Sequence, residues 1–259
     1  MKDEPILVVD VGNTNICIGI ERGRILQASW RLRTDPGQTV DEFFVTLVQL
    51  METHSVAREA IRGAIVASVV PQLSDVVAAG IERKLGAPVL MVGPGLRTGI
   101  SIRMDNPREV GADRIVNAVA AHELCPEGAV VVDLGTATTF DCISPSGEYL
   151  GGIIAPGIGI SAEALFERTA KLPEVTIQKP RRAIGKNTES SMQSGIFYGY
   201  VALIDGLVDR IRGELNFDPA VIATGGYSAA LAAESRTIAR VEPDLTLLGL
   251  AIVWDMNRG

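Results

Sequence analysis

The sequence predicts two α/β domains with mixed sheets, and three observations support this fold class. An apolar run that ends in an aspartate and a glycine, at residues 6–12, returns in mid-chain at residues 130–135. A second apolar run follows each copy, so each copy predicts a β-hairpin with a carboxylate at its turn. Behind each hairpin, strand patterns alternate with helical patterns, which is typical of α/β folds. The position of the repeat favours one domain at 1–124 and another at 125–259.

The first half of the chain continues from its hairpin into a third strand at 24–33, which ends at the turn Asp35-Pro36-Gly37. Apolar residues then recur at helical spacing over 39–53, and Pro71 stands where a further helix can begin. The other elements predicted here are a strand at 61–70, a helix from Pro71 to 85, a strand at 88–92, a polar loop to Pro107 and a helix at 111–124.

The second half again places strands before helices. Strands predicted at 129–133, 139–143 and 148–154 precede the turn Ala155-Pro156-Gly157. The elements that follow are a helix to Lys171, a basic polar loop at 173–187, a long helix at 188–215, a strand at 220–224 that ends in Thr224-Gly225-Gly226, and a helix at 245–257.

Composition excludes several classes of function. The 259 residues carry a net charge of −7 and a pI near 5.0, which argues against a nucleic-acid-binding surface. No apolar stretch approaches the roughly 18–20 residues that span a bilayer, and residues 2–5 run straight into a strand without a signal region. Cys17, Cys125 and Cys142 show neither paired nor zinc-site spacing. We therefore expect a cytoplasmic protein with reduced cysteines and with neither a membrane nor a nucleic acid as partner.

The repeated turn carries the strongest functional indication. Asp10 and Asp133 each end a strand beside Gly12 or Gly135, and a glycine lets phosphate oxygens approach the backbone closely. One such aspartate can be an ordinary turn residue, but two in matching contexts favour a site for a metal–polyphosphate such as Mg–ATP. The sequence contains neither the P-loop nor the Rossmann glycine pattern. Further hydrogen-bond donors at these turns are Asn13, Thr14, Thr136 and Thr138.

A second candidate site lies at residues 107–115, where Asp113 and Arg114 adjoin at the start of a predicted helix. Helix N–H groups and a guanidinium attract anions, so Arg114 could bind a substrate carboxylate. Asp113 could accept a proton from a substrate hydroxyl. The structural alternative is that Asp113 stabilises the first helical turn and Arg114 faces water.

The remaining polar and glycine-rich segments allow two interpretations each. The glycine clusters at 151–157 and 224–226 either admit a ligand close to the backbone or form tight turns, and the second is the better candidate for a nucleotide contact. The basic loop at 179–186 is either a solvated face or an attractor for phosphate. His54 and His122 lie near neither candidate site, so we expect no catalytic histidine.

Taken together and in this order, the motifs DVGNT, GADR, DLGTATT, GGIIAPG and TGG resemble those of the type III pantothenate kinases. That family belongs to the superfamily of acetate and sugar kinases, Hsp70 and actin. The resemblance extends from Asp10 to Leu248-Gly249-Leu250, and the GADR element is not shared by the superfamily at large. It implies two ribonuclease H-like (actin-like ATPase) domains, with sheets flanked by helices and a nucleotide cleft between the domains.

The resemblance also implies an enzyme that phosphorylates the 4′ hydroxyl of pantothenate with ATP, in the first step of coenzyme A biosynthesis. It implies Mg²⁺ with ATP, a monovalent cation (K⁺ or NH₄⁺), and a homodimer with the pantothenate site at the subunit interface. Asp113 is then the general base, Asp10 assists Mg–ATP, and Asp133 holds the monovalent cation. The implied pantothenate-binding residues are Gly111, Ala112, Asp113, Arg114 and Thr188. The implied ATP-binding residues are Asp10, Val11, Gly12, Asn13, Thr14, Asn15, Ile16, Cys17 and Thr136.

One residue departs from the family pattern. Many members carry a tyrosine seven residues before the GADR glycine, where it touches pantothenate, and Met104 stands there in this chain. Methionine keeps the apolar contact but lacks the phenol hydroxyl, so the shape of the pantothenate pocket stays open. Two alternatives in function also stay open, namely a non-catalytic regulatory relative and a kinase for another small hydroxy acid. An actin-like or Hsp70-like ATPase is less favoured, because the chain is too short for an added peptide-binding domain.

Overall fold

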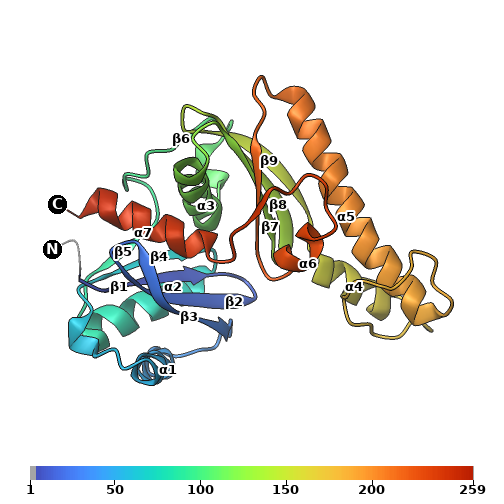
Figure 1. Cartoon of the computed structure of the whole chain (residues 1–259). Coiled ribbons are helices and arrows are strands. Elements are labelled where there is room, and N and C mark those ends of the chain that lie inside the picture. The colour runs from blue at the N-terminus through green and yellow to red at the C-terminus, as the bar shows by residue number, and fades with distance from the viewer. Residues whose placement is uncertain (1–3, 259) are drawn as a thin grey trace. The chain divides into compact units, whose positions relative to one another are not determined.

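The computed structural model describes residues 4–258, and its internal contacts divide the chain into two compact units (Figure 1). The first unit comprises residues up to Ile100, Asp105–Ala120 and the residues from Leu245 on, and the second comprises Ser101–Met104 and Ala121–Asp244. Each unit contains one mixed sheet, so the predicted α/β fold class is confirmed. The domain limits predicted at 1–124 and 125–259 stay a prediction; by contacts, the C-terminal helix groups with the first sheet.

The first sheet has the strand order β3-β2-β1-β4-β5. Its strands are β1 Ile6–Val11, β2 Asn15–Arg22, β3 Ile25–Arg33, β4 Ala64–Ser68 and β5 Val89–Met91. The first three form an antiparallel meander, and β4 and β5 extend the sheet in parallel from β1. Strand β4 is shorter than the strand predicted at 61–70, because Ile61 ends a 3-10 turn and Val70 already precedes the first turn of a helix.

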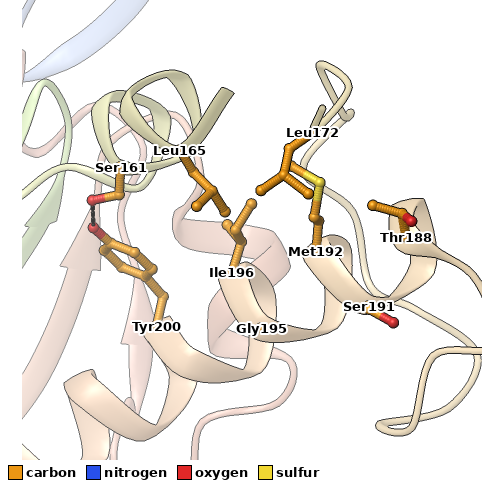
Figure 2. A pocket seen from close by; sticks show the side chains of 9 residues that line it. All are labelled: Ser161, Leu165, Leu172, Thr188, Ser191, Met192, Gly195, Ile196 and Tyr200. Atoms are coloured by element: carbon orange, nitrogen blue, oxygen red, sulfur yellow. Dashed lines mark hydrogen bonds between the residues drawn. The ribbon is translucent and has the colours of Figure 1, made fainter. Parts of the chain in front are cut away.

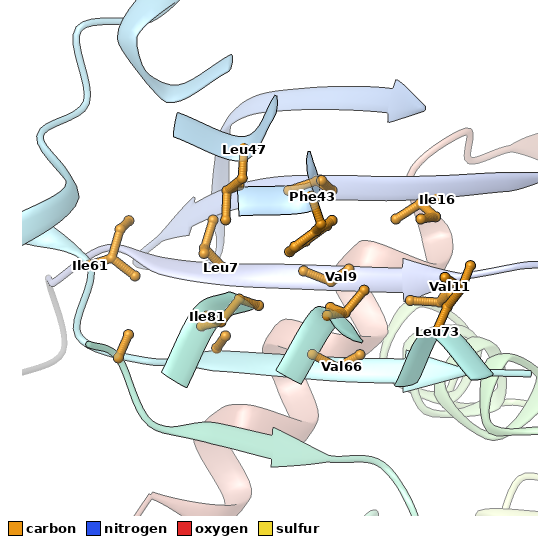
Figure 3. Packing of buried hydrophobic residues seen from close by; sticks show 14 of the residues in the cluster. Leu7, Val9, Val11, Ile16, Phe43, Leu47, Ile61, Val66, Leu73 and Ile81 are labelled. Carbon is orange, nitrogen blue, oxygen red and sulfur yellow. The ribbon is translucent and has the colours of Figure 1, made fainter. Parts of the chain in front are cut away.

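Helices cover both faces of the first sheet. They are α1 Val40–Thr53, α2 Pro71–Ala79 with a π-helical continuation Gly80–Leu85, α3 Ala112–Leu124 and α7 Leu245–Asn257. On one face, Phe43 of α1 and Leu73 of α2 are fully buried in a cluster with Val9 of β1 (Figure 3). On the other face, residues of α3 and α7 pack against Val8 and Ile65. Apolar burial on both faces is the main source of stability for such a sheet.

Helix α7 crosses α3 at very short range. A Cβ added to Gly249 would overlap the backbone carbonyl of Val116, so only glycine permits this approach. Beside the crossing, the Thr246 hydroxyl donates to Oδ1 of the fully buried Asn117 at 2.8 Å. The C-terminal helix therefore holds α3, and with it the segment that contains Asp113, on the first sheet.

The second sheet has the order β11-β10-β7-β8-β9-β6 and repeats the plan of the first. Its strands are β6 Ser101–Ile102, β7 Ala129–Leu134, β8 Ala137–Ile143, β9 Glu148–Pro156, β10 Ala220–Thr224 and β11 Arg240–Val241. Strands β7, β8 and β9 form an antiparallel meander, and β10 and β11 extend the sheet in parallel from β7. Strands β6 and β11 were not predicted from the sequence, because two-residue strands carry no periodic pattern.

Three helices pack on one face of the second sheet: α4 Ile158–Glu167, α5 Thr188–Glu214 and α6 Ser228–Ala232. The predicted helix after Gly157 ends at Glu167 rather than Lys171, and α6 was not predicted. Helix α5 is the longest element, at 27 residues, and it buries Phe197, Ile204 and Val208 against the sheet. Within residues 4–258, no helix is both long and apolar enough to cross a bilayer.

Glu21 of β2 is a buried carboxylate in the first unit, with only 7% of its surface exposed. Burial raises its pKa, the backbone N–H of Arg24 that it accepts lowers it in part, and the nearby carboxylate of Asp255 raises it further. A raised folded-state pKa means that protonation of Glu21 stabilises the fold. That stabilisation is fully present below the unfolded pKa and is lost as the pH rises through the folded pKa.

We expect Glu21→Gln to raise the melting temperature at about pH 8 and to change it little at about pH 4, because glutamine imitates the protonated acid. The glutamine carbonyl can still accept from Arg24. Thermal denaturation of both proteins across this pH range measures the effect, with the exposed Glu52→Gln as control. A lower melting temperature for Glu21→Gln at the higher pH would contradict the assignment.

Candidate active site

The first acidic turn joins β1 to β2. Asp10 is partly buried and pairs in register with Cys17 on β2 and with Ala67 on β4. The Gly12 N–H donates to the Asn15 carbonyl at 3.0 Å, so this N–H closes the turn and is not directed at a ligand. A Cβ added to Gly12 would lie 3.0 Å from the same oxygen. A larger residue at this position would therefore crowd the Asn15 carbonyl.

The start of the loop after β3 supports this turn. The Thr34 hydroxyl donates to the Gly12 carbonyl at 2.7 Å, and the Thr34 N–H donates to the Thr14 carbonyl at 3.0 Å. The side chains of Asn13 and Thr14 are exposed at the tip. These contacts hold a polar loop in one conformation, which lowers the ordering cost of binding a ligand there.

The remaining residues of the predicted ATP loop divide by burial. The side chains of Val11 and Ile16 are fully buried and belong to the hydrophobic core of the first unit. Only their backbone groups can reach a ligand. Cys17 is partly buried beside Asp10. Side-chain chemistry at this loop therefore rests on Asp10 and on the polar residues of the turn.

Asp113 lies in the first turn of α3, at the same edge of the first sheet as the Asp10 turn. A Cβ added to Gly111 would lie 3.6 Å from Cγ1 of Val69, and the Val69 N–H donates to the Val11 carbonyl at 3.0 Å. This short connection links the start of α3 to the residue that follows Asp10. The start of α3 and the end of β1 thus lie on either side of Val69 in the first unit.

The absence of a side chain at Gly111 leaves room for the Asp113 carboxylate. A Cβ at position 111 would overlap Oδ1 of the Asp113 carboxylate, and that oxygen accepts the Arg114 N–H at 2.8 Å. Asp113 and Arg114 are both partly buried. Both side chains therefore lie at the start of a helix, where the helix dipole favours anions.

The second acidic turn joins β7 to β8 and is one residue shorter. Asp133 is partly buried and pairs in register with Thr139 on β8 and Thr224 on β10. The Gly135 N–H donates to the Ala137 carbonyl at 3.1 Å, and Thr136 is exposed. Both repeated turns thus use their glycine N–H internally.

Two distant glycines converge on this second turn. Gly225 has a φ of +90°, and a Cβ there would lie 2.7 Å from the Leu134 carbonyl oxygen and 2.8 Å from Oδ1 of Asp133. The Gly157 N–H donates to the Thr136 carbonyl at 3.1 Å, and a Cβ on Gly157 would overlap that oxygen. The glycine clusters at 151–157 and 224–226 therefore each contribute a residue that lies directly against the Asp133 turn.

Thr138 does not belong to the exposed part of the turn. Its side chain is fully buried, and it shares a strand face with Phe140 and Cys142, which belong to the core beneath the helices. Within the described part of the chain its hydroxyl has no hydrogen-bond partner. The expectation that Thr138 donates at the turn was wrong, because strand alternation directs it into the core.

Thr188 lies apart from the Asp133 turn, at the first position of α5. Asn187 caps this helix by accepting the Ser190 N–H at 2.8 Å. Thr188 is exposed at one end of a groove of about 700 Å³ between α4 and α5 (Figure 2). The residues that line the groove are Ser161, Leu165, Leu172, Thr188, Ser191, Met192, Gly195, Ile196 and Tyr200. The groove could not be predicted from the sequence, because its walls come from α4, α5 and the loop between them, and none of these segments carries a recognisable motif.

Met104 contacts the second sheet. Strand β6 pairs with β9, and the Arg103 N–H continues that pairing by donating to the Tyr149 carbonyl at 2.8 Å. A Cβ on Gly151, whose φ is +114°, would lie 3.2 Å from the Met104 sulfur. Met104 therefore packs directly over backbone at Gly151.

The donor set of the two turns suits hard cations. Carboxylate, hydroxyl, amide and carbonyl oxygens are the ligands that Mg²⁺ and K⁺ prefer. Within residues 4–258, no group of three or more histidine, cysteine, aspartate or glutamate side chains could hold a metal ion by itself.

Two mixed α/β units, each with an acidic glycine turn after the first strand of its antiparallel meander, form a ribonuclease H-like fold of the actin-like ATPase class. Solved structures share this fold. A ROK family glucokinase from Streptomyces griseus, in complex with glucose and AMPPNP, matches with a TM-score of 0.53 and 13% identity, over 95% of this chain and 98% of that one. A Baf family transcriptional activator from Campylobacter jejuni matches with a TM-score of 0.61 and 20% identity, over 97% and 98%.

Sequence comparison gives the family. The model of the type III pantothenate kinase family matches residues 6–210. Type III pantothenate kinases from Moorella thermoacetica and Pelobacter propionicus are 50% and 51% identical, over 97% and 98% of this chain and 99% and 100% of theirs. The chain belongs to the type III pantothenate kinase family, and the resemblance stated from its motifs is confirmed.

Proposed function

We propose that the chain transfers the γ-phosphoryl group of ATP to the 4′ hydroxyl of pantothenate, the first step of coenzyme A biosynthesis, in the cytoplasm. The observation that carries this proposal is the link within the first unit between the Asp10 turn and the Asp113 helix start, through Val69. An acid suited to a metal–phosphate and an acid suited to an acceptor alcohol then lie at one sheet edge. Relatives that cover nearly the whole chain support the choice of acceptor.

In the proposed mechanism, Asp113 orients the hydroxyl and accepts its proton as the general base. Arg114 pairs with the pantothenate carboxylate in a charge-assisted hydrogen bond. Gly111 and Ala112 contribute to the same pantothenate pocket. Positioning and electrostatics supply most of the acceleration in phosphoryl transfer, and a base contributes about 10²–10⁴-fold.

The ATP side of the site uses both acidic turns. In our proposal, Asp10 and residues Val11, Gly12, Asn13, Thr14, Asn15, Ile16 and Cys17 contact the phosphates, as does Thr136. Asp10 would hold Mg²⁺ together with ATP, and Asp133 would hold a monovalent cation, K⁺ or NH₄⁺. When bound, these cations neutralise charge on the transferred phosphoryl group. A nucleotide cleft between the two units stays a prediction.

A substrate panel tests the proposed reaction. We expect ADP release in a coupled assay with pantothenate and ATP, and little release with other small hydroxy acids or with ATP alone. Release with another hydroxy acid would identify a kinase of different specificity. ATP hydrolysis without an acceptor, or no release at all, would exclude the proposed reaction and leave the regulatory alternative.

Asp113→Asn tests the general base. We expect kcat to fall by about 10²–10⁴-fold, because the amide cannot accept the proton, while nucleotide affinity measured by calorimetry stays near that of the wild type. Asp105→Asn is the matched control, since Asp105 is exposed in the segment before α3. Full turnover by Asp113→Asn would remove Asp113 from this role.

Replacement of potassium tests the role of Asp133. We expect activity in potassium or ammonium buffers and a loss of about tenfold or more in sodium alone, because a site of fixed size discriminates between the cations. Asp133→Asn should abolish the difference between buffers. Equal rates of the wild type in sodium and in potassium would contradict the cation assignment.

We also propose that the chain acts as a homodimer in which Thr188 contributes to the pantothenate site at the subunit interface. Exposed apolar side chains support this: Ile160, Leu165 and Phe166 on α4 are 38–45% exposed, and Ile154 on β9 is 67% exposed. Leu165 lines the groove together with Thr188, and Ile160 and Phe166 are on the same helix. Apolar surface of this kind marks protein interfaces, and a stable one buries about 1,200–2,000 Å².

Leu165→Glu tests the dimer surface. We expect a dimer mass for the wild type by light scattering, and a shift to monomer with loss of activity for the variant, because a charge is costly in an apolar interface. Ile25→Glu is the control, because Ile25 lies on β3 of the first unit and is 65% exposed. A wild type that is active as a monomer would exclude the proposed interface.

A further inference from the structure

A tyrosine of α5 is hydrogen-bonded to the main chain at the end of β9. Tyr200 is 8% exposed, and its hydroxyl lies 2.9 Å from the Pro156 carbonyl. The same hydroxyl lies 2.6 Å from the Ser161 hydroxyl, and Figure 2 shows this second contact. A carbonyl can only accept, so the Tyr200 proton is directed at Pro156. Ser161 must then be the donor in its bond to Tyr200. The Tyr200 hydroxyl therefore has one defined role toward each partner.

The carbonyl that Tyr200 binds immediately precedes Gly157. Gly157 donates its N–H to the Thr136 carbonyl at 3.1 Å, and its main chain is so close to Thr136 that a Cβ would overlap. Three consecutive links thus run from α5 to the Asp133 turn: Tyr200 to Pro156, Pro156 to Gly157 through the peptide bond, and Gly157 to Thr136. Because a peptide unit is planar and rigid, a shift of the Pro156 carbonyl moves the Gly157 N–H as well.

We propose that Tyr200, supported by Ser161, is a positioning residue for the Thr136 turn and so for ATP binding. This inference rests on the proposed function, in which Thr136 contacts ATP. The ring of Tyr200 belongs to the core beneath α5 and would hold the helix in place without its hydroxyl. The hydroxyl adds a directional contact to a carbonyl, which fixes the orientation of the turn rather than the packing of the helix.

Tyr200→Phe separates these two contributions, because it removes the hydroxyl and keeps the ring. We expect the KM for ATP, measured at saturating pantothenate, to rise by about three- to tenfold, the range set by one hydrogen bond. The KM for pantothenate and the melting temperature should stay close to those of the wild type. This division between the two KM values is not expected from a purely structural role.

Tyr198→Phe is the matched control. Tyr198 lies on the same helix, and its hydroxyl also donates to a main-chain carbonyl, that of Pro180, at 3.4 Å in the basic loop. Neither KM should change in this variant. Ser161→Ala provides a second test if Tyr200→Phe does not fold, and it should raise the KM for ATP in the same direction by a smaller factor.

Each outcome has a distinct meaning. A wild type without pantothenate-dependent ADP release would exclude the proposed function itself, before any variant is compared. With an active wild type, a selective rise in the KM for ATP supports the positioning role. An unchanged KM for ATP in Tyr200→Phe, an equal rise in both KM values, or the same effect in Tyr198→Phe would overturn it.

Discussion

At the carboxyl ends of β7 and β10 in the second sheet, the main chain of one segment packs directly against the main chain of another, with no side chain between them. Gly157 and Gly225 approach the Asp133 turn from two different segments, and a Cβ on either would meet backbone or carboxylate oxygens. Such an approach leaves no room for a side chain at either glycine, so two separate segments limit how far the backbone of the turn can move. The position of Asp133, and of Thr136 beside it, depends on this constraint.

In the first unit, hydrogen bonds from a neighbouring loop hold the acidic turn in place. Its acidic turn has one more residue and is supported by Thr34, whose hydroxyl and N–H bind two carbonyls of the loop. Gly111 leaves space for the Asp113 carboxylate, and α7 holds α3 through the close crossing at Gly249. The repeated meander therefore gives each unit one acidic turn. Each turn is stabilised by different contacts, from Thr34 in the first unit and from Gly157 and Gly225 in the second. Phosphoryl transfer depends on such fixed positions, because the protein contributes mainly placement and charge.

Local chemistry explains which features could be predicted from sequence. Helix α1 begins where Thr39 and Glu42 form a reciprocal capping box. The helical spacing of its apolar residues predicted a helix at 39–53, close to the observed Val40–Thr53. The paired acidic turns were visible because each combines a short apolar run with aspartate and glycine. Family motifs added the acceptor, and the role of Asp113 stays a prediction. These signals lie within a few residues of one another in the chain.

Features that depend on distant partners were not predicted. A glycine has the same appearance in sequence whether it makes a turn or admits a neighbouring strand, so the contact of Gly157 with Thr136 was not foreseen. The role of the Tyr200 hydroxyl was not predicted, since its partner is a carbonyl 44 residues away in the sequence. Helix α7 follows the second set of strands in sequence but packs with the first, because burial against β1 and α3 decides its place.

The claim that both acidic turns bind nucleotide can be tested directly by amide NMR on the uniformly ¹⁵N-labelled protein. Addition of Mg–AMPPNP should shift the amide signals of Gly12 to Asn15 and those of Gly135, Thr136 and Gly225 with the same midpoint, because one ligand would contact both turns. The amide signals of α1 should stay unchanged. Shifts confined to one turn, or shifts in the two turns with different midpoints, would contradict a single nucleotide site that uses Asp10 and Asp133 together.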